Sequence, residues 1–227
     1  MSIDFTGVTA VTIPDGNVVK IVRKSDGNII WEKPETGGLP DGYTQTAYIR
    51  STGTQYIDTG YIATSENYRI KCGFYFDAIV NNTVPFGGGA STDIISVLIR
   101  NSTIFHFYVG SGSVYATDVA ITHGVNYDME CWANNGTFTV VLNGASYSGA
   151  YSGAINKEYP LAIFANNMSG SVTAFSSIRF SAFQIYDNDV LVRDFLPCIN
   201  PDGIVGMYDM VEKIFYGNDG TGTFITG

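Results

Sequence analysis

Cysteine, histidine and basic residues are scarce in this sequence of 227 residues. It has three cysteines, two histidines and twelve lysines and arginines, against twenty-one acidic residues. The net charge of −9 disfavours nucleic acid and anionic membrane surfaces as partners, because both attract positively charged patches. Apolar runs long enough to cross a bilayer are also missing. We therefore expect neither nucleic-acid binding nor membrane insertion.

The scarcity of cysteine and histidine also argues against a metal site. Cys72, Cys131 and Cys198 lie far apart and fit neither a disulfide framework nor a zinc spacing, so we expect buried free thiols. Neither His106 nor His123 forms a metal pair with a cysteine by spacing. We expect no cofactor. The first residues lack a basic region followed by an apolar core, so we expect synthesis in a cytoplasm without a signal peptide.

Hydrophobic residues, glycine and tyrosine are plentiful. The sequence is 45% hydrophobic and contains 26 glycines and 15 tyrosines, while charged residues make up only 15%. This balance is typical of a folded chain with a sizeable core and many short strands joined by turns. We therefore predict an all-β protein.

The N-terminal part of the chain predicts a separate small unit. Three short strands are expected within residues 1–33, at 8–13, 18–23 and 29–31. So few short strands can hardly bury a core of their own, so this meander must pack on the main domain or on another chain. The linker that follows favours the second option, and with it a role in anchoring or assembly. Residues 34–42 hold two prolines and three glycines and read as a linker. The main domain is then expected at 43–227.

Residues 178–197 are the clearest supersecondary element of the main domain. Two apolar runs flank Asp187-Asn188-Asp189, and Asx residues suit the left-handed conformation of a hairpin turn. The apolar phase slips within the first run, which predicts a β-bulge near Ser181-Ala182. Pro197 is expected to end the second strand.

Further strands follow from alternation of apolar and polar residues. The main ones are expected at 68–76, 94–100, 104–109, 127–133, 137–142 and 161–165. Residues 207–216 are ambiguous, because their apolar spacing also fits a helix. The flanking glycines and the short length favour two strands around Glu212-Lys213.

Several motifs in the main domain resemble a known family. FTVVLNG, PLAIFANN and SIRFSAFQIYDNDVLVRDF are similar in type and order to strands of laminin G-like jelly rolls of the concanavalin A-like class. YIRSTGTQYIDTG looks like the opening strand of that family, and the segment from residue 195 to 224 is similar to tails found in phage and gut bacterial proteins. The resemblance covers residues 43–227 and implies an antiparallel two-sheet jelly-roll sandwich.

The resemblance implies binding of glycans or proteins. We expect a non-enzymatic phage structural protein, of tail-fibre, receptor-binding or particle-decoration type, that binds a host cell-surface glycan or protein. Its further partners would be other virion proteins and copies of itself, a trimer being one option. A carbohydrate-binding module of a gut bacterial surface protein, located at the bacterial cell surface, is the first alternative. Some relatives bind calcium, but no ligand cluster here matches theirs.

One strand carries the candidate binding residues. Alternation along 127–133 puts Asp128, Glu130 and Trp132 on the face opposite Met129 and Cys131. An indole can stack on a sugar ring while carboxylates accept its hydroxyl protons, so the three form a candidate sugar platform. The competing interpretation is a solvated outer face with one packed tryptophan.

Two residues on another strand extend the candidate site. His106 and Tyr108 share a face of strand 104–109 and are expected as neighbours of the platform. His106 lies between two phenylalanines, so it can also be a structural residue of the strand whose hydrogen bonds are satisfied within the protein. A glycoside hydrolase is the second alternative. The acidic Glu-x-Asp-x-x-Glu strand of hydrolytic relatives is not found, and Asp128 and Glu130 are the nearest equivalent.

Overall fold

The chain divides into two compact units. A computed structural model describes the backbone of residues 8–12, 18–23, 29–32, 38–90, 93–101, 104–116, 121–153, 155 and 158–227. The units are Met1–Pro40 and Asp41–Gly227, and each is described by itself. Every regular element in the described residues is a β-strand, which confirms the all-β prediction. The described part of the chain contains no helix that could span a membrane.

The smaller unit is a three-stranded antiparallel meander. Its strands pair in chain order and are β1 (Val8–Thr12), β2 (Val18–Arg23) and β3 (Ile29–Glu32). The predicted turns between these strands, and the first part of the predicted linker, fall outside the described residues. The anchoring role of the meander stays a prediction.

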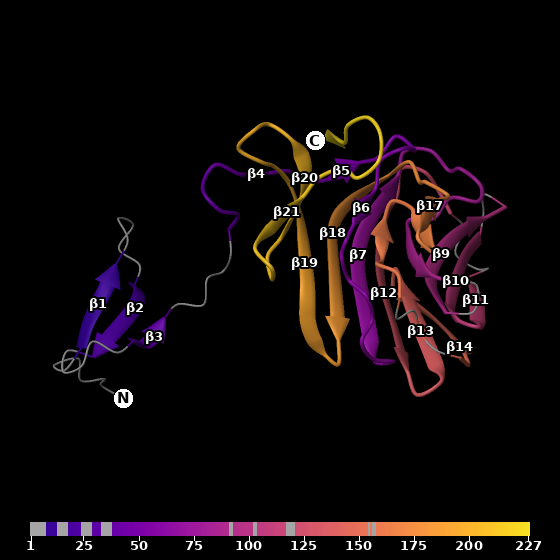
Figure 1. Cartoon of the computed structure of the whole chain (residues 1–227), viewed down its shortest axis with the longest axis horizontal. Helices are drawn as coiled ribbons and strands as arrows, with labels where there is room; N and C mark the ends of the chain where they lie inside the picture. The colour runs from indigo at the N-terminus through magenta and orange to yellow at the C-terminus, as the bar shows by residue number, and fades with distance from the viewer. Residues whose placement is uncertain are drawn as a thin grey trace. The chain divides into compact units, whose positions relative to one another are not determined.

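The larger unit is a sandwich of two sheets (Figure 1). Eight strands of the first sheet run in the order β14 (Ala145–Ala150), β13 (Thr137–Leu142), β12 (Asn126–Asn134), β7 (Tyr68–Phe76), β18 (Ile178–Asp187), β19 (Val190–Ile199), β20 (Val205–Asp209) and β21 (Ile214–Tyr216). Three two-residue strands complete this eleven-stranded sheet: β5 (Ile49–Arg50), β22 (Ile225–Thr226) and β4 (Thr44–Gln45).

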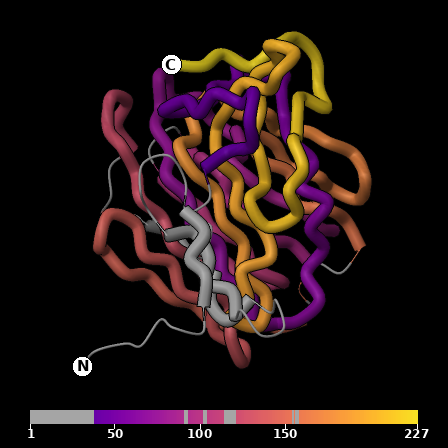
Figure 2. Tube along the Cα trace, turned by 90° about the vertical axis from the view of Figure 1, so that its left-hand side faces the viewer, coloured from indigo at the N-terminus to yellow at the C-terminus, as the bar shows by residue number. Residues whose placement is uncertain are grey.

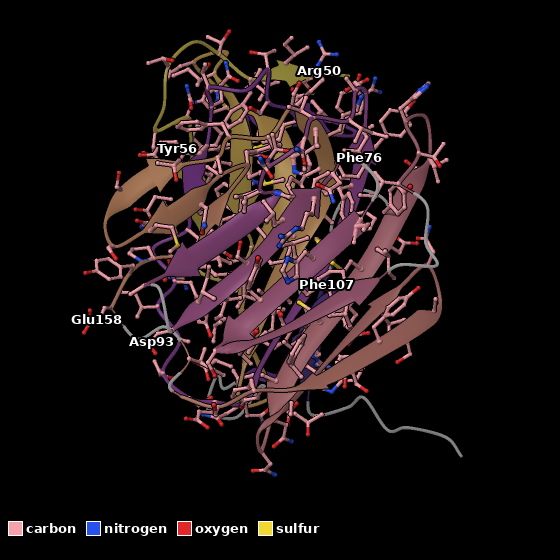
Figure 3. All side chains as sticks on the ribbon, turned by 90° about the vertical axis from the view of Figure 1, so that its right-hand side faces the viewer. Arg50, Tyr56, Phe76, Asp93, Phe107 and Glu158 are labelled. Atoms are coloured by element: carbon pink, nitrogen blue, oxygen red, sulfur yellow. The ribbon has the colours of Figure 1, made fainter. Side chains whose placement is uncertain are left out.

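The second sheet has eight strands and faces the viewer in Figure 3. Six run in the order β11 (Gly112–Ala116), β10 (Ile104–Gly110), β9 (Ile94–Arg100), β8 (Phe86–Gly89), β15 (Ala162–Ile163) and β6 (Ile57–Asp58). Two more are β16 (Asn166–Met168) and β17 (Ser171–Thr173). The strands of both sheets pair antiparallel, apart from the parallel pairing of β16 with β8.

Aromatic side chains join the two sheets. Phe74 of β7 stacks on Tyr127 of the neighbouring β12 with ring centroids 5.4 Å apart, and meets Phe105 of the opposite sheet edge-on at 5.9 Å. All three side chains are buried. Such aromatic pairs contribute about 0.5–1.5 kcal/mol each beyond the burial of their area. The alternation of β7, with every second residue buried, therefore serves a core between the sheets.

The β18–β19 hairpin forms as predicted, and it is drawn in orange in Figure 2. Asn188 and Asp189 form its two-residue turn with φ of 50° and 62°, in the left-handed region. The register between β18 and β7 shifts between Phe180 and Ala182, which confirms the bulge. Pro197 does not end the strand, contrary to prediction. Its lack of an N–H is tolerated, and its carbonyl accepts a hydrogen bond from the Thr46 amide at 3.0 Å.

The ambiguous segment at 207–216 is a hairpin. β20 and β21 pair through Met207 and Tyr216, and Lys213 takes a φ of 62° in the turn between them. The prediction of strands over a helix is confirmed.

Candidate functional site

The outer face of the eleven-stranded sheet carries the candidate residues of β12. Along this strand Tyr127, Met129 and Cys131 are buried, whereas Asp128 is exposed and Glu130 is half-buried. Trp132 is half-buried on the same outer face. The structure therefore places Asp128, Glu130 and Trp132 side by side, facing away from the core.

Neighbouring strands complete a first row of side chains across this face. Trp132 lies opposite Arg69 of β7, and Arg69 lies opposite Tyr186 of β18. The Arg69 guanidinium carbon lies 4.2 Å from the centroid of the Tyr186 ring. This cation–π contact holds the guanidinium between the two aromatic residues of the row.

A second row is polar and internally paired. The Glu130 carboxylate lies 3.2 Å from Lys71 Nζ and 3.5 Å from Arg69 Nη1. On the far side of Lys71, Gln184 Nε2 donates to Asp194 Oδ1 at 3.0 Å and Gln184 Oε1 accepts from the Tyr186 hydroxyl at 3.3 Å. These pairs fix the carboxylate and the amide, so the face presents polar groups in set positions.

A third row has a glycine at its centre. Gly73 lies opposite both Asp128 and Ala182, the residue that follows the bulge in β18. A Cβ at position 73 would lie 2.6 Å from Ser181 Oγ, so a side chain there would crowd the face. A hollow of about 310 Å³ opens above this row. It is lined by Lys71, Cys72, Gly73, Asp128, Met129, Glu130, Val141, Gly144, Ala182 and Gln184.

Two more hollows continue the first one along the strands. One, of about 310 Å³, is lined by Asn67, Arg69, Glu130, Trp132, Asn134 and Asp189. The other, of about 360 Å³, is lined by Ala47, Tyr48, Phe74, Tyr75, Asn126, Arg179 and Ser181. From Arg69 to Tyr75 the series runs along β7 for about 20 Å at about 3.3 Å per residue. We call this series of three hollows the outer groove.

His106 and Tyr108 are not part of the outer groove. Both lie on β10 in the eight-stranded sheet, and Phe105 and Phe107, with which they alternate, point into the core. They therefore face the opposite side of the sandwich, and the expectation that they neighbour Asp128 is corrected. His106 is buried against Tyr108, with ring centroids 3.9 Å apart. Burial, helped by the nearby Arg100, lowers the pKa of His106 to about 4.

Comparison with known proteins identifies the fold. No protein-family model matches the sequence, and neither does any curated protein. A solved structure from Bacteroides ovatus, to which carbohydrate binding has been ascribed, superposes on 91% of this chain and 67% of its own with a TM-score of 0.55 and 10% identity. The larger unit is a jelly roll. This confirms the fold that the laminin G-like resemblance predicted.

Two further solved structures match with lower TM-scores. Domains LG4–5 of the mouse laminin α1 chain give a TM-score of 0.44 at 12% identity, over 77% of this chain and 48% of theirs. Tailspike protein 2 of bacteriophage CBA120 gives 0.40 at 13% identity, over 66% of this chain and 30% of its own.

Metal-binding and reactive groups are sparse in the jelly roll. Among the described residues no three His, Cys, Asp or Glu side chains gather as metal ligands would. Cys72, Cys131 and Cys198 are free and buried, as predicted. Burial raises the pKa of Cys131 to about 12 and that of Cys198 to about 11, so these thiols stay protonated and serve the core.

Proposed function

We propose that the jelly roll is a non-catalytic glycan-binding domain whose ligand lies in the outer groove. The observation that carries this proposal is the arrangement of the three rows. The aromatic residues Trp132 and Tyr186 lie on either side of Arg69 in the first row, the hollow over the third row has a glycine floor, and the polar groups of the row between them are already held by partners.

The chemistry of a sugar suits this surface. A pyranose offers an apolar face to an indole or phenol ring and hydroxyl groups to carboxylates and amides around its edge. Glu130 and Gln184 lie on opposite sides of Lys71 and can accept or donate such hydrogen bonds. Because their partners fix them before binding, little ordering is needed when the ligand arrives.

The positions of the carboxylates favour binding over hydrolysis. Hydrolytic relatives carry their carboxylates on one strand, in the pattern Glu-x-Asp-x-x-Glu. Asp128 and Glu130 also share one strand, β12, but if Asp128 is the Asp of that pattern, its two glutamate positions hold Asn126 and Cys131. The strand β18 on the other side of β7 supplies only the amide of Gln184 to this hollow. Glu130 is also held by two cations, which suits an acceptor of hydroxyl protons.

The wider role that we propose is display on a phage particle, with the N-terminal meander as anchor and the jelly roll facing a host-surface glycan. The division of the chain into two compact units supports a separately displayed module. A carbohydrate-binding module at a bacterial surface remains the alternative.

Binding of the full chain to a glycan array, with Trp132→Ala compared with Tyr108→Ala, tests the proposal. Trp132→Ala should weaken binding several-fold, since an aromatic contact contributes about 1 kcal/mol. Its melting temperature should fall much less than for a core aromatic, whose truncation costs about 3–5 kcal/mol. Tyr108→Ala removes an aromatic ring from the opposite face and should bind like the parent.

Equal loss of binding in both variants, or full binding by Trp132→Ala, would place the ligand elsewhere. The bound glycan should also stay intact on prolonged incubation. Release of reducing ends by the parent protein, abolished in Glu130→Gln, would show a hydrolase instead.

A further inference from the structure

Arg179 forms a rigid clamp at one end of the outer groove. Its guanidinium carbon lies 4.4 Å from the centroid of the Tyr48 ring and 4.6 Å from that of Tyr75, so two aromatic rings hold it. The clamp lies in the row where Tyr75 of β7, Arg179 of β18 and Arg50 of β5 are direct cross-strand neighbours. Figure 3 labels Arg50 at the upper end of the sandwich.

The hydrogen bonds of Arg179 use only one edge of the guanidinium. Nε donates to Asp77 Oδ2 at 2.8 Å and Nη2 donates to Asp77 Oδ1. A guanidinium has five N–H donors, so three are left after this pairing, and two of them lie on the edge that Nη1 and Nη2 share. The side chain is 27% exposed and lines the 360 Å³ hollow together with Asn126 and Ser181.

The charge around the clamp is positive although the whole chain carries −9. Arg50 Nη1 lies 3.6 Å from Asp77 Oδ2, so two arginines share a single carboxylate. The other residues that line this hollow are neutral. An anion placed here meets a surplus of one positive charge and a planar pair of donors fixed by the rings.

We propose that this end of the outer groove binds the carboxylate of a uronic acid unit, so that the ligand is an acidic glycan. The inference rests on the proposed glycan-binding function. A planar carboxylate matches the fork of an arginine, which forms two parallel hydrogen bonds with it. The rings of Tyr48 and Tyr75 fix the orientation of the Arg179 guanidinium before the ligand binds. The central hollow lies at Gly73, two residues along β7 from Tyr75, and would hold the next unit of the sugar chain.

Pairs of ligands that differ only in their carboxyl groups measure the contribution of the carboxylate to binding. Oligogalacturonate, oligomannuronate and oligoglucuronate are each titrated into the full chain by calorimetry, alongside the same oligosaccharide with its carboxyl groups reduced to neutral alcohols. For the pair that binds, the acidic form should bind about tenfold more tightly at low salt, as expected for a hydrogen bond to a charged group. Added salt should reduce the difference in affinity between the acidic and the reduced forms.

Variants then assign the preference to Arg179. Arg179→Lys keeps a cation beside Asp77 but loses the fork, and Arg179→Gln loses both. Arg179→Gln should bind the acidic and the reduced forms equally, with the parent's affinity for the reduced form. Arg179→Lys should keep only the smaller, salt-sensitive part of the preference. Arg100→Gln changes the net charge by the same amount as Arg179→Gln, on the other sheet, and should keep the preference.

Equal binding of both forms by the parent, or a preference that survives in both Arg179 variants, would overturn the acidic-glycan inference and leave the proposed function standing. Failure of the parent to bind any member of the three pairs would overturn the inference, and the array then decides separately on the proposed function.

Discussion

Asp187 shows how a single buried carboxylate can hold a loop. It is 6% exposed and accepts hydrogen bonds from the Thr64 amide at 3.0 Å, the Thr64 hydroxyl at 2.6 Å and the hydroxyls of Ser65 and Tyr61. Burial alone would raise the pKa of Asp187, but these hydrogen bonds outweigh it and the pKa is lowered. The carboxylate thus ties residues 61–65 to the end of β18.

This residue gives a pH-dependent prediction. Because its folded pKa is depressed, Asp187 stabilises the fold at pH values above its unfolded pKa of about 3.9, and the contribution is lost as pH falls through the lower folded pKa. Asp187→Asn should reduce the free energy of unfolding by about 1–3 kcal/mol at pH 7. Denaturant unfolding of both proteins should show that the difference between their free energies of unfolding is smaller at pH 3 than at pH 7. A difference in free energy of unfolding that stays constant or grows at pH 3 would contradict the role of the carboxylate.

At the scale of elements, the strands with strong alternation were predictable. The predicted bounds 68–76 and 137–142 are those of β7 and β13, because buried apolar residues alternate there with less buried residues that begin as charged ones in β7 and as threonines in β13. β14 and β17 escaped prediction. Their sequences, ASYSGA and SVT, are rich in serine and small residues and owe their strand form to pairing with β13 and β16.

The glycine floor of β7 gives a prediction for the outer groove. Gly73→Val places a branched side chain in the central hollow, next to Ser181 Oγ. This exposed hydroxyl donates to the Gly73 carbonyl at 3.2 Å and can exchange that bond for one to water when it rotates away. The variant should fold, because valine favours strands, but it should lose glycan binding. Ser148→Val adds the same side chain to an exposed position of β14 on the same sheet and away from the hollows, and should bind normally. Binding by Gly73→Val at parental affinity would exclude the central hollow as the site.

At the scale of the whole molecule, the site depends on strand pairings that are distant in sequence. Alternation predicted which face Asp128, Glu130 and Trp132 share, but Arg69, Lys71 and Gln184 join them only because β12 pairs with β7 and β7 with β18. The alternation of polar residues along 68–76 indicated that Arg69 and Lys71 share an outer face. The sequence did not indicate which strands pair with this one. The same limit explains the misplacement of His106 and Tyr108, since local pattern does not tell which sheet a strand enters.

The two units should separate without loss of the jelly roll. The larger unit has its own continuous core, so deletion of residues 1–38 should leave a cooperatively melting protein that still binds glycan. The same deletion should abolish incorporation into a particle if the meander is the anchor. Melting curves, glycan titration and a particle-assembly assay measure these outcomes. Normal assembly of the truncated protein would refute the anchoring role, and loss of folding would refute the independence of the units.

Fluorescence of Trp132 tests most directly whether glycan lies in the outer groove. The sequence contains two tryptophans, so in Trp31→Phe the remaining indole is Trp132, at the edge of the groove. Titration of this variant with the glycan identified on the array should change the emission in a saturable way, with the Kd that calorimetry gives. Saturable heat of binding with unchanged Trp132 emission would show that the ligand binds elsewhere on the molecule.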